Sequence, residues 1–247
     1  MSFMALMTLA NLLVIAELYL PTDRTHSSAL RLKVFQSNVN TRNRQYDRVI
    51  AAAKASDADL ISFEELDSAW VTALDSGLRK DYPYRIALAR DDNFGIAAFS
   101  RFPMKAEVLY LELPIVLARV EIPGHPLNFV CVHTLPPMQT ASYDTRNQEF
   151  ADLALLKSKL SGAMIVAGDF NCSSWSPKFT ELLKNTGLKD SRQGFGVQAS
   201  WPVFLGIPLI PIDHFLVSED LVVLSREVLP DVGSDHYPVK MEVSFKN

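Results

Sequence analysis

The chain has 247 residues, of which 48% are hydrophobic and 21% are charged, and its formal net charge at pH 7 is −4. This length can bury a core without disulfides, and the two cysteines, Cys131 and Cys172, form no zinc-ligand or disulfide pattern. The negative charge excludes a protein that relies on a broad basic surface to hold nucleic acid. It does not exclude a nucleic-acid substrate, because bound divalent cations change the local field.

The N-terminal stretch FMALMTLANLLVIAELYL, residues 3–20, is apolar except for three residues: Thr8, Asn11 and Glu17. It reaches the roughly 17 residues needed to span a bilayer, so we expect membrane association through residues 3–20. The alternative is an amphipathic helix packed on the domain. No Lys or Arg precedes the stretch and no small-residue cleavage site follows it, which argues against a secretory signal peptide. If it spans, the basic residues after it, Arg24, Arg31 and Lys33, favour a cytoplasmic domain.

The apolar stretch and a polar linker occupy residues 1–29, and we expect one catalytic domain over residues 30–247. Short apolar runs predict strands at 30–38, 59–66, 84–90, 94–100, 107–113, 117–122, 127–134, 163–170, 212–218 and 237–245. Helical patterns fall at 42–56, 68–78, 142–160 and 176–187. The last of these has Ser176 as its expected N-cap, Pro177 in the first turn and Gly187 at its end. Many strands with interspersed helices indicate two packed sheets flanked by helices.

Polar side chains lie where these strands begin or end. They are Asn38, Glu64, Glu65, His133, Asp169, Asn171, Asp213, Asp235 and His236. A single such residue is an ordinary turn former. If the sheet ends converge, however, the set supplies oxygen ligands for a hard cation, donors for an oxyanion and an acid–base pair. These are the components of metal-assisted phosphoryl hydrolysis.

The segments SNVN, FEEL, GDFN and SDHYPV, in this order, resemble those of the endonuclease/exonuclease/phosphatase superfamily over about residues 31–245. The group includes deoxyribonuclease I, abasic endonucleases, neutral sphingomyelinases and inositol polyphosphate 5-phosphatases. The chain also resembles a bacterial subgroup with hydrophobic N-terminal segments. The resemblance implies a deoxyribonuclease I-like α/β (α+β) fold, a four-layer α/β/β/α sandwich with the site at one edge of two sheets.

The resemblance also implies roles for individual residues. Mg²⁺, or alternatively Mn²⁺, is expected on Glu65 and Asn38, with Asp235 beside the metal. Asp169 resembles the residue that orients or deprotonates the attacking water, and Asn171 resembles one that holds a phosphoryl oxygen. His236 resembles the histidine that faces the scissile phosphate, oriented by Asp213, and His133 resembles the second histidine of the deoxyribonuclease I and sphingomyelinase branches.

Two positions depart from the family pattern. Position 64 is usually Gln and is Glu here, and position 40 is often Asp in abasic endonucleases and is Asn here. Glu64 and Glu65 point to opposite faces if both lie on a strand, so only one can meet the metal. We assign the metal to Glu65 and expect Glu64 to lie behind it or to be partly exposed.

Four further features are candidates for substrate contact. Arg42 and Arg44 could reach a phosphate or form a solvated helix face, and Arg146 could approach the substrate or pair with an acid. Trp201 could stack on a substrate or pack in the core. The apolar run VFLGIPLIPI at 203–212 could be buried or could form a rim suited to a lipid.

The leading hypothesis is a divalent-metal-dependent phosphohydrolase that cleaves a phosphoester by in-line attack of water, with a nuclease as the broadest reading and nucleic acid as a partner. The alternative is a lipid phosphodiesterase or phosphatase of the sphingomyelinase or inositol-phosphatase type. A second alternative is an inactive membrane-tethered scaffold. We expect a bacterial protein at the inner membrane or in the cytoplasm. The sequence leaves the substrate, endo- or exo-action and oligomeric state open.

Overall fold

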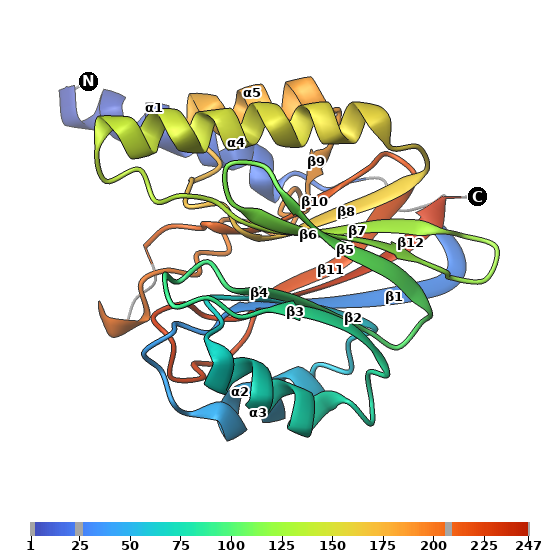
Figure 1. Ribbon diagram of the computed structural model, residues 1–247. Coiled ribbons are helices and arrows are strands. Elements are labelled where there is room, and N and C mark those ends of the chain that lie inside the picture. The colour runs from blue at the N-terminus through green and yellow to red at the C-terminus, as the bar shows by residue number, and fades with distance from the viewer. Residues whose placement is uncertain (1–2, 23–26, 206–208, 247) are drawn as a thin grey trace.

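The computed structural model describes residues 3–22, 27–205 and 209–246. Two six-stranded sheets pack face to face, with helices on the outer face of each (Figure 1). This is the expected four-layer sandwich of the deoxyribonuclease I type. In each sheet, two parallel strands lie near the middle and antiparallel strands extend the sheet on both sides.

The first sheet has the strand order β11-β12-β1-β2-β4-β3. Its strands are β1 (Ser27–Asn38), β2 (Leu60–Glu64), β3 (Tyr84–Leu88), β4 (Ile96–Ser100), β11 (Leu221–Val228) and β12 (Val239–Lys246). Helices α2 (Tyr46–Ala55) and α3 (Ser68–Leu78) cover its outer face (Figure 1).

The second sheet has the order β5-β6-β7-β8-β10-β9. Its strands are β5 (Met104–Tyr110), β6 (Pro114–Val120), β7 (Leu127–His133), β8 (Ala163–Asp169), β9 (Lys189–Asp190) and β10 (Asp213–Val217). Helices α4 (Thr140–Lys159) and α5 (Pro177–Thr186) lie on its outer face. The remaining elements are α1 (Phe3–Ala16) and two short 3₁₀ helices, η1 (Glu17–Tyr19) and η2 (Val203–Leu205).

Three apolar layers hold the sandwich together. The central layer lies between the sheets and includes Leu60, Phe129 and Phe215. The outer layers join each sheet to its helices, with Trp70 of α3 and Phe179 of α5 among the buried side chains. Because both faces of each central strand are covered, β2, β4, β7, β8 and β10 are buried along their whole length.

Helix α5 illustrates local control by sequence. The Ser176 side chain accepts a hydrogen bond from Lys178 N, Pro177 begins the helix, and Gly187 ends it with a φ of 67°. All three positions were predicted, because hydroxyl N-caps, proline in the first turn and glycine beyond the last turn each satisfy a geometric need of helix ends.

The sequence prediction differs from the structure for several strands. Strand β1 begins at Ser27, inside the predicted linker, and the two-residue strand β9 was not predicted. Strands β5 and β6 begin three residues earlier than expected, because Pro114 is the first residue of β6 rather than a break before it. Proline is tolerated at the first residue of a strand. Strand β11 was not predicted, because Ser225, Arg226 and Glu227 interrupt its apolar pattern. Arg226 is nevertheless buried.

The predicted apolar stretch 3–20 contains the 14-residue helix α1 followed by η1. Across the described residues, no helix is both long and apolar enough to cross a lipid bilayer.

Gly168, the residue before Asp169, is required by a close approach of backbone. Its φ is +149°, and a Cβ placed there would lie 1.8 Å from Val132 O of the neighbouring strand β7. A side chain at this position therefore forces β7 and β8 apart at their carboxyl ends.

We predict that Gly168→Ala lowers the free energy of unfolding by at least about 2 kcal/mol, because the strands must separate and the backbone is strained. Urea denaturation measures this change. The matched control is Gly162→Ala, at a φ of +83° with open space around the Cβ, where the backbone cost alone is about 1 kcal/mol. Equal losses in the two variants would contradict the packing explanation.

Candidate active site

The polar residues predicted from the strand ends converge at one edge of the sandwich. Parallel pairs β1–β2 and β7–β8 each bring two carboxyl ends together, placing Asn38 opposite Glu64 and His133 opposite Asp169. Strand β10 runs antiparallel to β8, so its first residue, Asp213, also lies opposite Asp169. The turn containing Asp235 and His236 reaches the same edge, because it precedes β12, which runs antiparallel to β1.

Asn38 connects the two sheets within the site. Its Nδ2 donates to Glu65 Oε1 at 3.0 Å and to Asp169 Oδ2 at 3.2 Å. Asn38 Oδ1 accepts from the backbone N–H of Asn40 at 3.0 Å, and the Asn38 side chain is fully buried. One amide nitrogen therefore faces two carboxylates from different sheets.

Glu65 points into the site because the chain bends immediately after β2. Its φ is 62°, a left-handed conformation that is uncommon for residues other than glycine. The Thr41 N–H donates to Glu65 Oε2 at 3.3 Å, and the Thr41 hydroxyl donates to the Glu65 carbonyl at 2.9 Å. Strained backbone of this kind is often found at functional sites, where the surrounding contacts hold it.

His236 and Asp213 form a buried pair. His236 Nδ1 lies 2.9 Å from Asp213 Oδ2, and His236 Nε2 faces Asp169 Oδ2 at 3.6 Å. Burial alone would lower the pKa of His236, but the carboxylates of Asp213 and Asp169 outweigh it and raise this pKa to about 10. Near neutral pH, His236 is therefore a cation that presents Nε2–H toward the site.

Asp169 lies at the centre of the cluster. Its Oδ1 accepts from Asn171 N at 2.8 Å, and its Oδ2 lies 3.7 Å from His133 Nε2. Burial raises the pKa of Asp169 to about 6, although the nearby histidines act in the opposite direction. The carboxylate is thus ionised at pH 7 but basic enough to accept a proton, which suits a general base.

Asn171 and Arg146 are coupled through the backbone. Asn171 has a φ of 44°, and its Nδ2 donates to Thr134 O at 2.8 Å and lies 3.4 Å from His133 Nε2. The buried Arg146 donates from a terminal nitrogen to Asn171 O at 3.1 Å, and its guanidinium lies 5.1 Å from the centre of the Phe150 ring. The described contacts of Arg146 therefore hold the Asn171 turn from behind.

The other predicted residues lie around this cluster. Asp235 accepts from Asn40 Nδ2 at 2.8 Å and lies 3.4 Å from Trp201 Nε1. The Trp201 ring is 6.5 Å from that of His236, so Trp201 lies beside the site. Arg42 is exposed, whereas Arg44 forms an ion pair with Asp67 at 2.7 Å.

Glu64 is fully buried, so of its two expected positions, behind the metal ligand or partly exposed, the structure excludes the second. It accepts hydrogen bonds from Ser62 Oγ and from Gln36 Nε2, and the same Gln36 nitrogen donates to Asp213 Oδ1 at 2.9 Å. Gln36 and Ser62 were not predicted as site residues. Gln36 lies two residues before Asn38, on the same face of β1. Its polar side chain within an apolar strand is the sequence feature that could have identified it as a site residue.

Two groups of side chains could interact with a metal ion. Within the described residues, Asp169, Asp213 and His236 present atoms within 4.8 Å of one another. Asp213 and His236, however, are already hydrogen-bonded to each other, which leaves them less suited to bind a metal. Glu65 supplies a carboxylate, a ligand type that Mg²⁺ prefers. Asn38 turns its Nδ2 donor toward Glu65 and its Oδ1 toward Asn40 N, so its oxygen would reach the same ion only with the amide group turned over. The carboxylates of Glu65 and Asp169 face each other across Asn38, and the negative charge of this pair fits a divalent cation.

Burial raises the pKa of Glu64 from 4.5 to about 8. The unfolded chain loses this proton at lower pH, so the stability associated with neutral Glu64 falls as the pH rises from 4.5 to about 8. We predict that Glu64→Gln, which cannot ionise, gains stability relative to the unsubstituted protein between pH 5 and pH 8. Urea midpoints measured across this range test it. A large loss of stability in Glu64→Gln at every pH would contradict a neutral Glu64.

We predict that Asp213→Asn lowers the pKa of His236 by about 1–3, since a neighbouring negative charge is removed. The stability contributed by this raised pKa is complete below about 6.5 and is lost as the pH rises through about 10. NMR titration of the histidine ring protons measures the shift. Asp144→Asn, on the exposed side of α4, is the control, and an unchanged His236 titration in Asp213→Asn would contradict the ion pair.

Comparisons with known proteins agree with this fold. The model of the endonuclease/exonuclease/phosphatase family matches residues 35–236. No curated protein matches the chain in sequence. Among solved structures, a mannosyl-6-phosphatase of Bacteroides thetaiotaomicron has a TM-score of 0.73 at 19% identity, with 87% of this chain and 100% of that chain covered.

Two other solved structures share the fold. TDP2 of D. rerio, in complex with a single-strand DNA product, has a TM-score of 0.72 at 14% identity and covers 87% of this chain and 99% of its own. A beta toxin mutant of Staphylococcus aureus with bound magnesium ions has a TM-score of 0.67 at 19% identity and covers 88% and 100%. The family match includes the converging strand ends from Asn38 to His236, and the chain belongs to the endonuclease/exonuclease/phosphatase family.

Proposed function

We propose that this protein is a divalent-metal-dependent phosphohydrolase that cleaves a phosphoester by in-line attack of water. The observation that carries the proposal is the position of Asp169. Its carboxylate accepts a hydrogen bond from Asn38, which also donates to Glu65. It faces the protonated His236, whose Nδ1 is hydrogen-bonded to Asp213. A general base (Asp169), a positively charged histidine (His236) and a candidate metal ligand (Glu65) are therefore grouped in one place.

Three residues of the cluster, Asp169, His236 and Asp213, have defined parts in this reaction. Asp169 takes a proton from the attacking water, while its second oxygen remains fixed by the Asn171 N–H. His236 Nε2–H donates to a phosphoryl oxygen as negative charge develops there. Asp213 keeps His236 charged and oriented through Nδ1.

The divalent cation would be held by Glu65 and Asn38, with Asp235 nearby, and would neutralise charge on the phosphoryl oxygens. The acidic residues around this region favour a cation electrostatically. The neighbouring structure with bound magnesium ions supports Mg²⁺ as the ion to test first.

A nuclease is the substrate class proposed first, supported by the DNA product bound to the D. rerio neighbour. A specific observation favours a lipid phosphodiesterase as the second candidate: Phe204 and Leu209, close in sequence to Trp201, are 72% and 57% exposed. An apolar rim beside a hydrolytic site suits a substrate with acyl chains. An inactive scaffold is disfavoured, because the base, the histidine and its orienting carboxylate are all present and in contact.

We predict that Asp169→Asn and His236→Ala each reduce turnover by at least about 10²-fold, since each removes a proton acceptor or an oxyanion donor. The assay is Mg²⁺-dependent hydrolysis of bis-p-nitrophenyl phosphate, plasmid DNA, RNA, sphingomyelin and inositol phosphates, and EDTA should abolish it.

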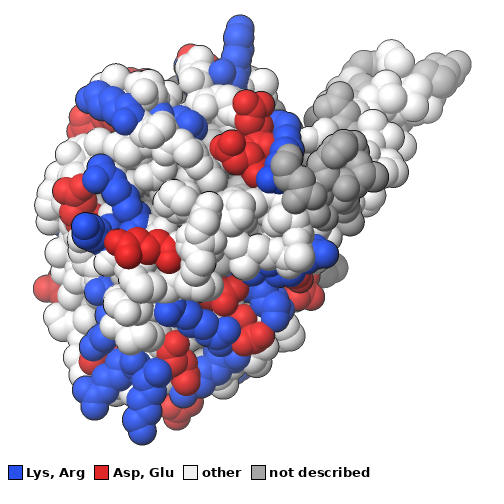
Figure 2. Space-filling model, turned by 90° about the vertical axis from the view of Figure 1, so that its right-hand side faces the viewer, with Lys and Arg blue, Asp and Glu red and all other residues white. Residues whose placement is uncertain are grey.

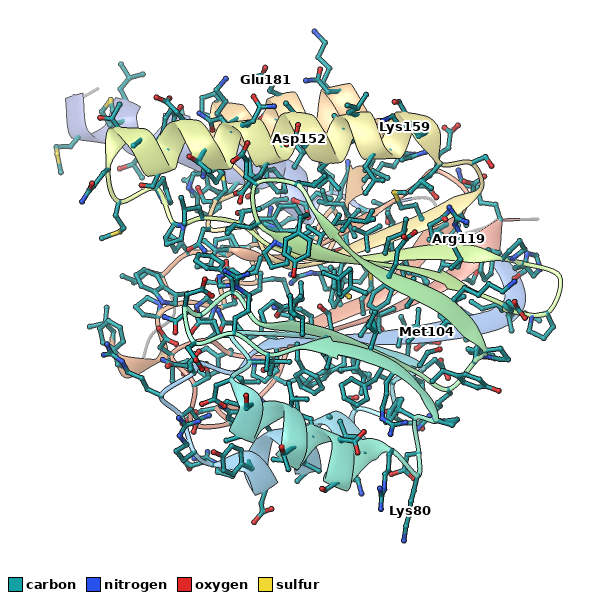
Figure 3. All side chains as sticks on the ribbon, viewed as in Figure 1. Lys80, Met104, Arg119, Asp152, Lys159 and Glu181 are labelled. Carbon is teal, nitrogen blue, oxygen red and sulfur yellow. The ribbon has the colours of Figure 1, made fainter. Side chains whose placement is uncertain are left out.

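The control variant is Glu181→Gln, because Figure 3 shows Glu181 on the outer helix layer, away from the strand ends. The substrate with the highest kcat/KM identifies the class. Hydrolysis that persists in EDTA, or in both site variants, would contradict the proposed mechanism.

A further inference from the structure

Helix α1 displays apolar side chains to solvent. Its 14 residues, FMALMTLANLLVIA, include no charged residue. Met4, Leu6, Leu12 and Leu13 are 75%, 53%, 52% and 64% exposed. At about 100° per residue these positions fall on several sides of the helix. In Figure 2, the arm that projects at the upper right, where α1 lies, shows no Lys, Arg, Asp or Glu among its described residues.

The base of α1 is attached to the domain. Leu18 O, in η1, accepts hydrogen bonds from Gly194 N and Gly196 N, both at 2.9 Å. The Tyr19 ring packs against Gly196 so closely that a Cβ there would lie 2.8 Å from it. The helix is therefore held at a defined place on the domain while most of its described side chains remain exposed.

A second exposed apolar group lies beside the active site. It consists of Phe204, Leu205 and Leu209, which are 72%, 54% and 57% exposed. This group is anchored by Val203 N, which donates to Asp235 O at 2.9 Å, and by the edge-to-face contact of Phe204 with Trp201. We call it the η2 edge.

Both apolar groups are on the side of the molecule that carries the site. In Figure 1, β1 begins at the right, beside the C-terminus, and ends at the left, where Asn38 lies. The free end of α1 and the η2 edge also lie at the left of this view. The free end of α1 and the η2 edge therefore reach the same side of the molecule as the strand ends in this view, and Figure 2 shows that α1 also projects beyond the body of the domain.

We propose that α1 and the η2 edge dock together on a lipid bilayer and turn the mouth of the active site toward the membrane surface. A protein groove covers one stripe of a helix, whereas hydrocarbon can cover all sides of a helix that lacks a polar face. With 14 residues and a rise of about 1.5 Å per residue, α1 is about 21 Å long, shorter than the roughly 30 Å hydrocarbon core. It inserts partway and does not cross.

The chemistry of the surface also defines the lipid requirement. The contacts are apolar and the chain carries a formal net charge of −4, so attraction to anionic headgroups is not the driving force. Docking should therefore occur on zwitterionic phosphatidylcholine and should be insensitive to salt, because hydrophobic transfer is not screened by ions. This proposal is independent of the hydrolase activity proposed above.

The test is flotation of the full-length protein with phosphatidylcholine vesicles at low and high salt. The α1 variant carries Leu6→Gln, Leu9→Gln, Leu12→Gln and Leu13→Gln, and the edge variant carries Phe204→Ser and Leu209→Ser. The matched control carries Tyr84→Ser and Leu155→Ser, two exposed apolar positions on β3 and α4. Circular dichroism establishes that each variant is folded.

We expect the unsubstituted protein and the control to float equally at both salt concentrations. The α1 variant should lose at least about tenfold in vesicle affinity and the edge variant at least about threefold, since each buried leucine or phenylalanine contributes a large apolar transfer term. Undiminished flotation of the α1 variant would overturn the proposal. So would absence of flotation by the unsubstituted protein, and sedimentation velocity would then show whether a second copy covers α1.

Discussion

The site depends on the convergence of two parallel strand pairs at one edge of the sandwich. Strands β1 and β2 in one sheet, and β7 and β8 in the other, end within hydrogen-bonding reach of each other, and Asn38 makes the connection to Asp169. Parallel neighbours place their carboxyl ends at the same edge, so polar residues that follow buried strands gather there without any extra element. The central apolar layer holds the two sheets in this relation.

Burial gives the cluster its chemical properties. Asp169, Asp213 and His236 are almost inaccessible to solvent, so their charges act on one another with little screening. Asp213 and His236 form a hydrogen-bonded ion pair. Burial raises the pKa of Asp169, whereas the two histidines, His133 and His236, and the donors Asn38 Nδ2 and Asn171 N stabilise its charged form. A carboxylate in that balance has a raised pKa and remains ionised at neutral pH. The same burial would be costly without Gln36, which donates to both Glu64 and Asp213.

The two adjacent glutamates show how backbone geometry separates similar residues. Glu64 ends β2 and points into the dry space between the sheets, where burial favours its neutral form. Glu65 follows in a left-handed conformation and bonds to Asn38 and Thr41 at the site. Adjacent residues thus have different roles: Glu64 is a buried supporting residue, and Glu65 is a candidate metal ligand.

The sequence alone predicted the layer architecture and most of the residues that gather in the candidate site. Alternating apolar runs and helix caps are local features, and the polar residues at strand ends are visible because they interrupt apolar runs at Asn38, His133 and Asp169. The tertiary structure decided what depends on contacts distant in sequence. Gln36 meets Asp213, 177 residues away, and Arg146 supports Asn171. Strand β11 was missed because Ser225, Arg226 and Glu227 interrupt its apolar pattern. Arg226 is nevertheless buried and donates to Asp213 O of the opposite sheet. No local pattern can report such pairings, because they exist only when the two sheets face each other.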